Sequence, residues 1–148
     1  MKETSQEIRS LVHKMVSELS IVHSDETESK LLPDKWSKKE ILGHLIDSAL
    51  NNHQRCVRAG YNAADQFPPY NQNEWVRLQH YNELDWHDLI RFWNEINQQL
   101  CHVIEHLPDE TKLNKCNIGK EEPVTLEFII KDYLRHTQHH IKQILGAQ

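Results

Sequence analysis

Two histidines four positions apart, His136 and His140, are the residues whose spacing most directly indicates chemistry in this chain. If the surrounding segment is a helix, this spacing places both imidazoles on one face, with about 6 Å between their Cβ atoms. Two imidazole nitrogens in that position can bind one transition-metal ion. The pair therefore predicts a metal site, provided that a third ligand lies close by.

The direction in which each side chain points supports this pair. With a helical advance of about 100° per residue, His140 falls inside the apolar stripe of residues 126–145, and His136 falls on its edge. His139 falls outside the stripe. We therefore expect His136 and His140 to face the protein interior or its rim and His139 to face solvent.

A second pair with the same spacing, His102 and His106, has a different expected position. It belongs to residues 86–107, whose apolar positions alternate steps of four and three, as is typical of a helix bundle. Both histidines fall off that seam. A chain with 11 histidines is expected to contain about one such pair by chance, and we expect this pair to be exposed to solvent.

The third ligand is expected from another helix. His44 lies near the core face of residues 38–59, and Ser48, Asn51 and Arg55 continue from it along one polar stripe. Three histidines from two helices leave coordination positions open, which is typical of a catalytic rather than a structural metal site. Periodicity alone leaves open the alternative that the three histidines are unrelated, partly buried and hydrogen-bonded.

The composition of the chain excludes several functions. Its 148 residues suffice for a single domain, residues 1–148, with a sizeable core. A net charge of −5 gives no basic surface for nucleic acid, and the apolar runs are too short to span a membrane. The N-terminus lacks the apolar core of a signal peptide. The three cysteines lie far apart and are expected to be reduced thiols, so we expect a cytoplasmic protein.

Four amphipathic segments are expected to form the helices that position these residues. They comprise residues 4–22, 38–59, 86–107 and 126–145. Ser37 and Glu40 match a capping box at the start of the second segment, and Gly60 marks its expected end. Thr4 and Glu7 match a similar box at the start of the first.

The connections between these segments are long. They comprise residues 22–37, 60–85 and 107–125. Long connections without structure of their own are uncommon and often functional. No segment shows a sustained alternation of period two, so no β-sheet is expected. The expected fold is therefore all-α, a four-helix bundle with long connections.

Two blocks of sequence resemble the DinB/YfiT-like superfamily. Residues 35–48 (KWSKKEILGHLIDS) are similar to its W-S-x-x-E-x-x-x-H-L-x-D block, and residues 135–144 (RHTQHHIKQI) to its H-x-x-x-H-x-x-Q-I block. Residues 123–126 also match the usual segment before the last helix. The two histidine-bearing blocks are specific in combination, whereas neither is specific alone.

The resemblance implies that the three metal histidines of the family correspond to His44, His136 and His140 and bind one divalent ion, often nickel or zinc. It implies a four-helix bundle with non-sequential neighbours and, frequently, a homodimer. Characterised relatives include metal-dependent transferases that join a low-molecular-weight thiol to an electrophile. Residues 60–85 match no motif of the family, so no substrate-binding residue carries over.

These observations favour a metal-dependent enzyme that transfers a low-molecular-weight thiol to a small electrophile, as in detoxification. Arg55 and Asn51 could bind an acidic part of the thiol, or could lie on a solvated helix edge. Asp47 could orient His44, and for Asp132 we favour an ordinary exposed carboxylate. The alternatives are a metal-dependent hydrolase and a non-catalytic helical bundle that binds a partner or a small molecule.

Overall fold

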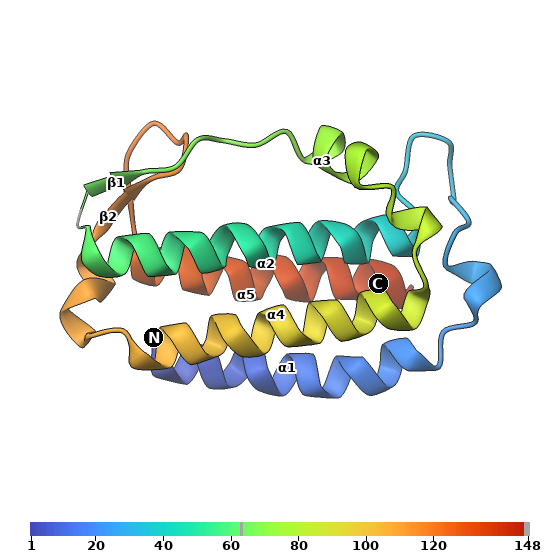
Figure 1. The fold of residues 1–148 in the computed structure, drawn as a ribbon, viewed down its shortest axis with the longest axis horizontal. Coiled ribbons are helices and arrows are strands. Elements are labelled where there is room, and N and C mark those ends of the chain that lie inside the picture. Colours follow the sequence, from blue (N-terminus) through green and yellow to red (C-terminus); the bar gives the residue numbers. More distant parts are fainter. Residues whose placement is uncertain (63, 147–148) are drawn as a thin grey trace.

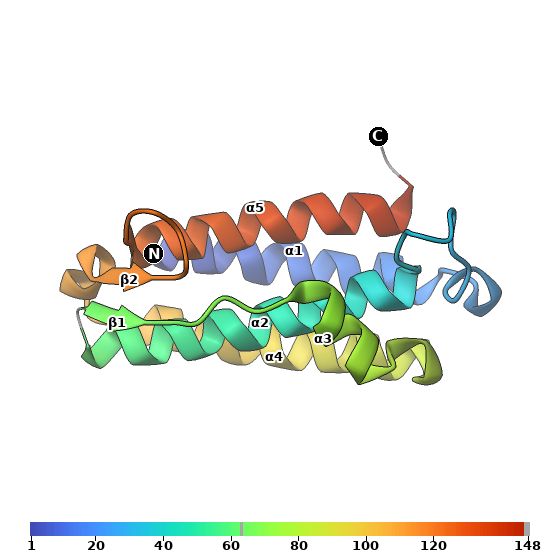
Figure 2. The ribbon, with the colours of Figure 1, turned by 90° about the horizontal axis from the view of Figure 1, so that it is seen from above.

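Four long helices form the body of the protein in the computed structural model, which describes residues 1–62 and 64–146 (Figure 1). These helices are α1 (Lys2–Ser20), α2 (Lys38–Tyr61), α4 (Trp86–His106) and α5 (Leu126–Leu145). Helices α1 and α5 run in one direction, and α2 and α4 run in the opposite direction (Figures 1 and 2). Both α1 and α2 pack against α4 and α5. The expected four-helix bundle with non-sequential neighbours is confirmed.

The connections carry short elements. They are the 3₁₀ turns η1 (Ser24–Glu26), η2 (Tyr81–Glu83) and η3 (Asp109–Leu113), the helix α3 (Gln72–Gln79), and the strands β1 (Ala64–Gln66), β2 (Lys115–Asn117) and β3 (Val124–Thr125). The strands form a sheet in the order β1-β2-β3, with β1 parallel to β2 and β2 antiparallel to β3. The expectation of no sheet is therefore wrong. Strands of two or three residues are too short to produce a visible alternation of period two.

The core lies where the apolar stripes of the four long helices meet. Completely buried side chains come from every helix: Ile8 and Leu19 from α1, Leu42 and Leu45 from α2, Trp93 from α4, and Leu126 and Ile144 from α5. Burial of apolar surface stabilises a fold by about 25 cal/mol per Å². Because these apolar side chains include none of the candidate metal ligands, we expect the helices to stay together without a metal.

Helix α2 begins where the sequence predicts. The Ser37 hydroxyl accepts a hydrogen bond from the backbone N–H of Glu40 at 3.1 Å, and the Glu40 carboxylate accepts one from the backbone N–H of Ser37 at 2.8 Å. This reciprocal capping box satisfies two N–H groups that have no partner within the helix. It fixes the start of the helix that carries His44.

Two other expected helix boundaries are wrong. Helix α1 begins at Lys2, so Thr4 is a buried residue of the helix rather than its cap. Gly60 does not end α2, which continues to Tyr61. A Cβ atom on Gly60 would lie 2.7 Å from a methyl carbon of Leu107. The glycine therefore serves the close approach of the chain after α4 rather than a helix stop.

The connection between α2 and α4 runs along the length of the bundle. It leaves α2 at the end that carries the sheet, passes along α2 through β1 and α3, and reaches α4 at the opposite end (Figures 1 and 2). At η2, the ring of Tyr81 packs on α2, where a Cβ atom on Gly43 would lie 2.1 Å from that ring. The absence of a side chain at Gly43 allows this connection to close on α2 directly beside His44.

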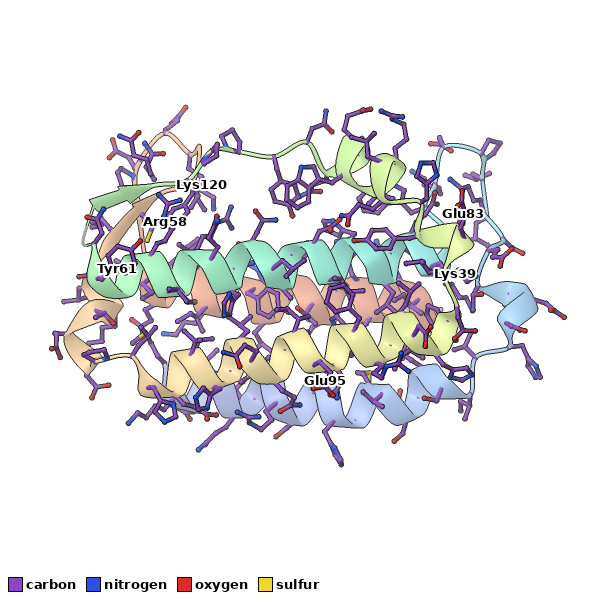
Figure 3. All side chains as sticks on the ribbon, viewed as in Figure 1. Lys39, Arg58, Tyr61, Glu83, Glu95 and Lys120 are labelled. Atoms are coloured by element: carbon purple, nitrogen blue, oxygen red, sulfur yellow. The ribbon has the colours of Figure 1, made fainter. Side chains whose placement is uncertain are left out.

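A buried lysine fixes the connection between α1 and α2. The Lys39 ammonium donates to the Glu28 carboxylate at 2.7 Å and to the backbone carbonyl of Asn82 at 3.1 Å. Figure 3 shows Lys39 and Glu83 at this end of the bundle. The segment before α2 is thereby tied to η2.

Among the residues that the structure describes, no helix has the length and apolar character needed to cross a bilayer.

Candidate metal centre

Three histidines from two helices meet at one point of the bundle. His44 on α2 is completely buried, and His136 and His140 on α5 are half-buried. Their candidate ligand atoms all lie within 4.8 Å of one another, and the Nε2 atoms of His44 and His136 are 3.0 Å apart. The structure therefore brings together the three histidines that the sequence singles out. We call them the histidine cluster.

The other histidines considered in the sequence lie where the helical period places them. His139 is exposed on α5, next to His140 in sequence but on a different face. His102 and His106 are exposed on α4, and Nδ1 of His106 lies 2.8 Å from the backbone carbonyl of His102. None of these three residues belongs to the histidine cluster.

The surroundings of the cluster keep its imidazoles neutral. Burial, together with the imidazolium charges of His136 and His140, lowers the pKa of His44 to about 3. Burial and the charge of His140 lower the pKa of His136 to about 4, although Asp132 opposes this change. The pKa of His140 is also lowered, mainly by burial, and its hydrogen bond to Gln143 opposes the shift. Neutral imidazole is the form that binds a metal.

Gln143 selects the tautomer of His140. Its side-chain oxygen lies 2.8 Å from Nδ1 of His140, and because an amide oxygen only accepts hydrogen bonds, Nδ1 must carry the proton. The side-chain nitrogen of Gln143 lies 3.1 Å from Nε2 of His139, which orients the amide. Nε2 of His140 is then left with a free lone pair for a metal.

The expected role of Asp47 is wrong. Asp47 is completely buried, but its carboxylate accepts hydrogen bonds from the Tyr81 hydroxyl at 2.7 Å and from the side-chain amide of Gln79. Nδ1 of His44 is buried without a hydrogen-bond partner among the described residues. The reason is the packing of the α2–α4 connection on α2, which supplies Asp47 with Gln79 from the end of α3 and Tyr81 from η2. Asp47 therefore positions the connection rather than the imidazole.

Asp132 also differs in detail from the expected exposed carboxylate. It is half-buried and forms an ion pair with Arg135 on the same helix. Nδ1 of His136, like that of His44, is buried without a partner among the described residues. Asp132 raises the pKa of His136 through its charge alone.

The histidine cluster fits a divalent transition metal. Zinc–nitrogen bonds of about 2.0–2.1 Å place two imidazole nitrogens on one ion at most about 4.2 Å apart. The Nε2 atoms of His44 and His136, at 3.0 Å, lie within this limit, and the 4.8 Å span of the whole cluster exceeds it only slightly. Three nitrogen donors suit nickel or zinc better than magnesium or calcium, which prefer oxygen.

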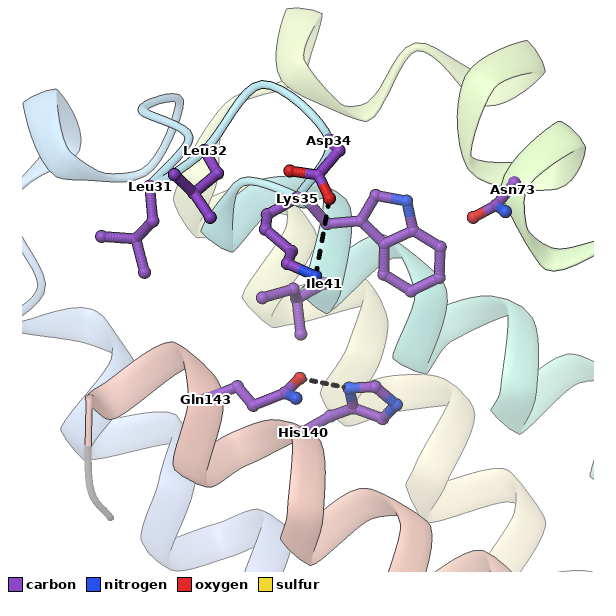
Figure 4. Close-up of a pocket in the computed structure, with 9 residues that line it drawn as sticks. Leu31, Leu32, Asp34, Lys35, Ile41, Asn73, His140 and Gln143 are labelled. Atoms are coloured by element: carbon purple, nitrogen blue, oxygen red, sulfur yellow. Dashed lines mark hydrogen bonds and ion pairs between the residues drawn. The ribbon is translucent and has the colours of Figure 1, made fainter.

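A groove opens beside His140. Figure 4 shows its lining residues on α2, α3, α5 and the connection before α2. It has a volume of about 500 Å³, and its lining includes apolar side chains contributed by Leu31, Leu32, Trp36 and Ile41. The ring of Trp36 lies 4.9 Å from the ring of His44, measured between centroids. Of the histidine cluster, His140 lines this groove.

A smaller cavity adjoins the cluster at His136. Its volume is about 150 Å³, and it is lined by Ser48, Asn52, Arg55, Tyr70, Gln72, Ile118, Ile129, Asp132, Tyr133 and His136. We call it the Arg55 cavity. Arg55 lines this cavity, whereas Asn51, the other residue considered for an acidic group, does not. The Asn51 side chain donates to the backbone carbonyl of Asp47 at 2.8 Å. Asn52 lines the cavity in place of Asn51.

Several residues of the site are missing from the sequence-based prediction. Asn52 follows Ser48 by four positions, so helical spacing carried a usable signal for it. Gln143 follows His140 by three positions, which is the same kind of signal. Tyr70 and Gln72 come from the long connection, and no local pattern shows which helix it crosses.

Comparison with known proteins places the chain in a family. Residues 6–144 match the DinB superfamily. The chain therefore belongs to the DinB superfamily.

Known relatives share the fold at low sequence identity. The chain is 20% identical to YfiT of Bacillus subtilis over 132 residues, which cover 88% of this chain and 74% of YfiT. The structure of YfiT, described as a probable metal-dependent hydrolase with an unusual four-helix bundle topology, matches with a TM-score of 0.84 and 18% identity, over 99% of this chain and 86% of that one. A mycothiol-dependent maleylpyruvate isomerase matches with a TM-score of 0.76 and 16% identity, over 99% of this chain and 61% of the isomerase.

Proposed function

We propose that the protein is a metal-dependent enzyme that transfers a low-molecular-weight thiol to a small electrophile. The histidine cluster would hold one divalent ion, nickel or zinc, through His44, His136 and His140. The similarity to YfiT, described as metal-dependent, and to an isomerase that depends on the thiol mycothiol supports this proposal.

The presence of two separate spaces beside the cluster carries the proposal. The groove of about 500 Å³ reaches His140, and the Arg55 cavity of about 150 Å³ reaches His136. A hydrolase needs space for one substrate and a water molecule, whereas a transferase must bring two reactants together. The surface of the groove is mainly apolar and that of the cavity is mainly polar, so the two spaces suit reactants of different chemistry.

A bound divalent metal would supply the ionisation of the thiol near neutral pH, where a free thiol with a pKa of about 8.5 is mostly protonated. In the transfer, the sulfur loses its proton to solvent and forms a bond to the electrophilic carbon. The leaving group departs with the electron pair of the bond that breaks. The neutral imidazoles would bind the ion through their nitrogen lone pairs, and the ring of Trp36 lies 4.9 Å from the ring of His44.

The cysteines of the chain are unsuited to act as the nucleophile. Cys56, Cys101 and Cys116 are all buried, and burial raises the pKa of Cys56 to about 12. Burial also raises the pKa of Cys101. The sulfur must therefore come from a second molecule.

Metal-dependent hydrolysis is the second candidate, because the chain is similar to YfiT. It requires a general base near the attacking water. Asp132 is the carboxylate that lines the Arg55 cavity together with His136, but it is already engaged in an ion pair with Arg135. Hydrolysis therefore has less support from the site than transfer.

The test is a conjugation assay with metal-reconstituted protein that carries no His tag. A panel of low-molecular-weight thiols is offered with monochlorobimane as the electrophile. We expect conjugation that requires metal and is lost in His44→Ala. The control is His139→Ala, which alters an exposed histidine of α5 and should retain activity. A well-occupied metal site without conjugation of any thiol would favour hydrolysis instead.

A further inference from the structure

Arg55 brings a positive charge into the Arg55 cavity, and no described carboxylate forms an ion pair with it. Its Nη1 atom lies 3.4 Å from the side-chain oxygen of Asn52, a long contact to a neutral acceptor. Its Nε atom is buried without a hydrogen-bond partner, and no ion pair formed by the described residues includes it. Burial lowers the pKa of the guanidinium, yet arginine stays charged at neutral pH. Because buried charges in proteins are normally paired, the cavity favours an anionic group.

The other walls of the cavity leave this charge available. Asn52, Tyr70 and Gln72 are neutral polar residues, and burial raises the pKa of Tyr70, which keeps its hydroxyl protonated. The carboxylate of the lining, Asp132, acts on Arg55 through its charge, but its ion pair is with Arg135. The described groups that line the cavity, with this partner included, therefore carry a net positive charge.

The shape of the site selects the kind of anion. The planar guanidinium fork matches a carboxylate through two parallel hydrogen bonds. A volume of about 150 Å³ holds several water molecules of about 30 Å³ each, and hence a small carboxylate-bearing fragment. His44 and Arg55 are 11 positions apart on α2, or about 16 Å along the helix axis. A ligand that reaches both therefore carries its carboxylate several bonds away from the atom at the histidine cluster.

We propose that the Arg55 cavity binds the carboxylate of an elongated low-molecular-weight thiol, while the sulfur of the same molecule reaches the histidine cluster. The identity of the ligand as a thiol rests on the proposed function. The carboxylate site itself requires neither metal nor catalysis. The groove beside His140 is left for the electrophile.

The carboxylate site is tested by NMR titration of metal-free, ¹⁵N-labelled protein with propionate, and with propionamide as its neutral analogue. Omitting the metal prevents direct binding of the carboxylate to an ion. We expect propionate to shift the Arg55 Nε–H resonance and to bind about 10- to 100-fold more tightly than propionamide, as a charge-assisted hydrogen bond predicts. Equal affinity for the two compounds, or a shift that avoids Arg55, would overturn the carboxylate site.

Three variants separate the site from a general effect of charge. Arg55→Gln should abolish the preference for propionate, and Arg55→Lys should restore part of it because lysine keeps the charge without the fork. Arg58→Gln removes a charge from the same helix, where the guanidinium lies over the ring of Phe67 at 4.8 Å and at the end of the bundle that carries the sheet (Figure 3). This control should bind propionate as the wild type does. A preference for propionate that survives in Arg55→Gln contradicts the proposal. If that variant does not fold, the affinities of the wild-type protein for propionate and propionamide still test the carboxylate site.

The link to the thiol is tested separately in the conjugation assay. Glutathione serves as a thiol with distant carboxylates, and 2-mercaptoethanol as one without. Arg55→Gln should raise the KM for glutathione about 10-fold or more and leave the KM for 2-mercaptoethanol unchanged. If both values stay unchanged while propionate binds, the cavity holds an anion that is not the thiol. If no thiol is conjugated at all, the proposed function fails while the NMR result still reports on the carboxylate site.

Discussion

The Nε2 atoms of His44 and His136 lie 3.0 Å apart, although 92 positions separate the two residues along the chain. The core residues of α2 and α5 pack these helices against each other, and this packing brings His44 close to His136. Two imidazole lone pairs repel each other at this distance unless a proton or a cation lies between them. A metal ion shared by the two nitrogens removes the repulsion, which is the physical basis of the proposed metal site.

We expect His44→Ala, His136→Ala or His140→Ala to reduce the metal content of the purified protein from one divalent ion per chain to nearly none. Each change removes one of three nitrogen donors, and two donors from flexible side chains bind an ion far more weakly. Elemental analysis of protein made without a tag provides the measurement. His139→Ala should keep its metal, and equal loss there would show that the exposed face of α5 binds the ion.

Gln143→Ala is expected to weaken metal affinity by about 10- to 100-fold without removing a ligand. The variant frees Nδ1 of His140 from its 2.8 Å hydrogen bond, so the imidazole is no longer held in one orientation and tautomer. Competition against a chromophoric chelator measures the affinity. Gln138→Ala alters an exposed glutamine of the same helix and serves as the control. Equal affinities for both variants would rule out a role for Gln143 in positioning His140.

The stability of the metal-free protein should fall with acidification below about pH 6.5, the ordinary pKa of histidine. His44 and His136 have pKa values of about 3 and about 4 in the folded protein. Between these values and about 6.5, the unfolded chain binds more protons than the folded protein, so the free energy of unfolding decreases as pH decreases.

Each of these two residues contributes a slope of about 1.4 kcal/mol per pH unit within that window. Urea unfolding at pH 6, 5 and 4.5 gives the slope for the wild type and for His44→Gln, whose side chain does not titrate. We expect the variant to have the shallower slope. Identical slopes would show that His44 titrates in the folded protein much as it does in water.

Gly43→Ala should destabilise the protein by about 2 kcal/mol or more, because its Cβ atom would lie 2.1 Å from the ring of Tyr81. Gly60→Ala provides a matched comparison, since its Cβ atom would meet only a methyl carbon of Leu107 at 2.7 Å. There, the gain of about 1 kcal/mol in helix propensity offsets much of the crowding. Urea unfolding of both variants measures the difference, and equal stabilities would contradict the close contact at Tyr81.

The helices were predictable because each of their signals is local. The capping box of Ser37 and Glu40 fixed the start of α2, and the apolar period marked all four long helices. The small sheet was not predictable, since β1 pairs with β2 across some 50 positions through backbone hydrogen bonds that leave no side-chain pattern.

The part of the site that depends on the direction of side chains within one helix was predictable. Phase placed His136 and His140 toward the interior, and the structure adds the distance to His44. It could not place Tyr81, whose contact with Asp47 depends on how a long connection crosses α2. This contact is the reason why the expected pairing of Asp47 with His44 was wrong. Tertiary packing between distant segments decided the partner of the carboxylate.

The connection between α2 and α4 touches every part of the site except the histidine cluster itself. Tyr70 and Gln72 line the Arg55 cavity, Asn73 lines the groove, and Tyr81 holds Asp47. The histidines, in contrast, lie on α2 and α5. In the proposed enzyme, this connection would contribute to the choice of ligand without supplying a metal ligand. Exchanging residues 62–80 should therefore change which small molecules the protein binds and leave its metal content unchanged.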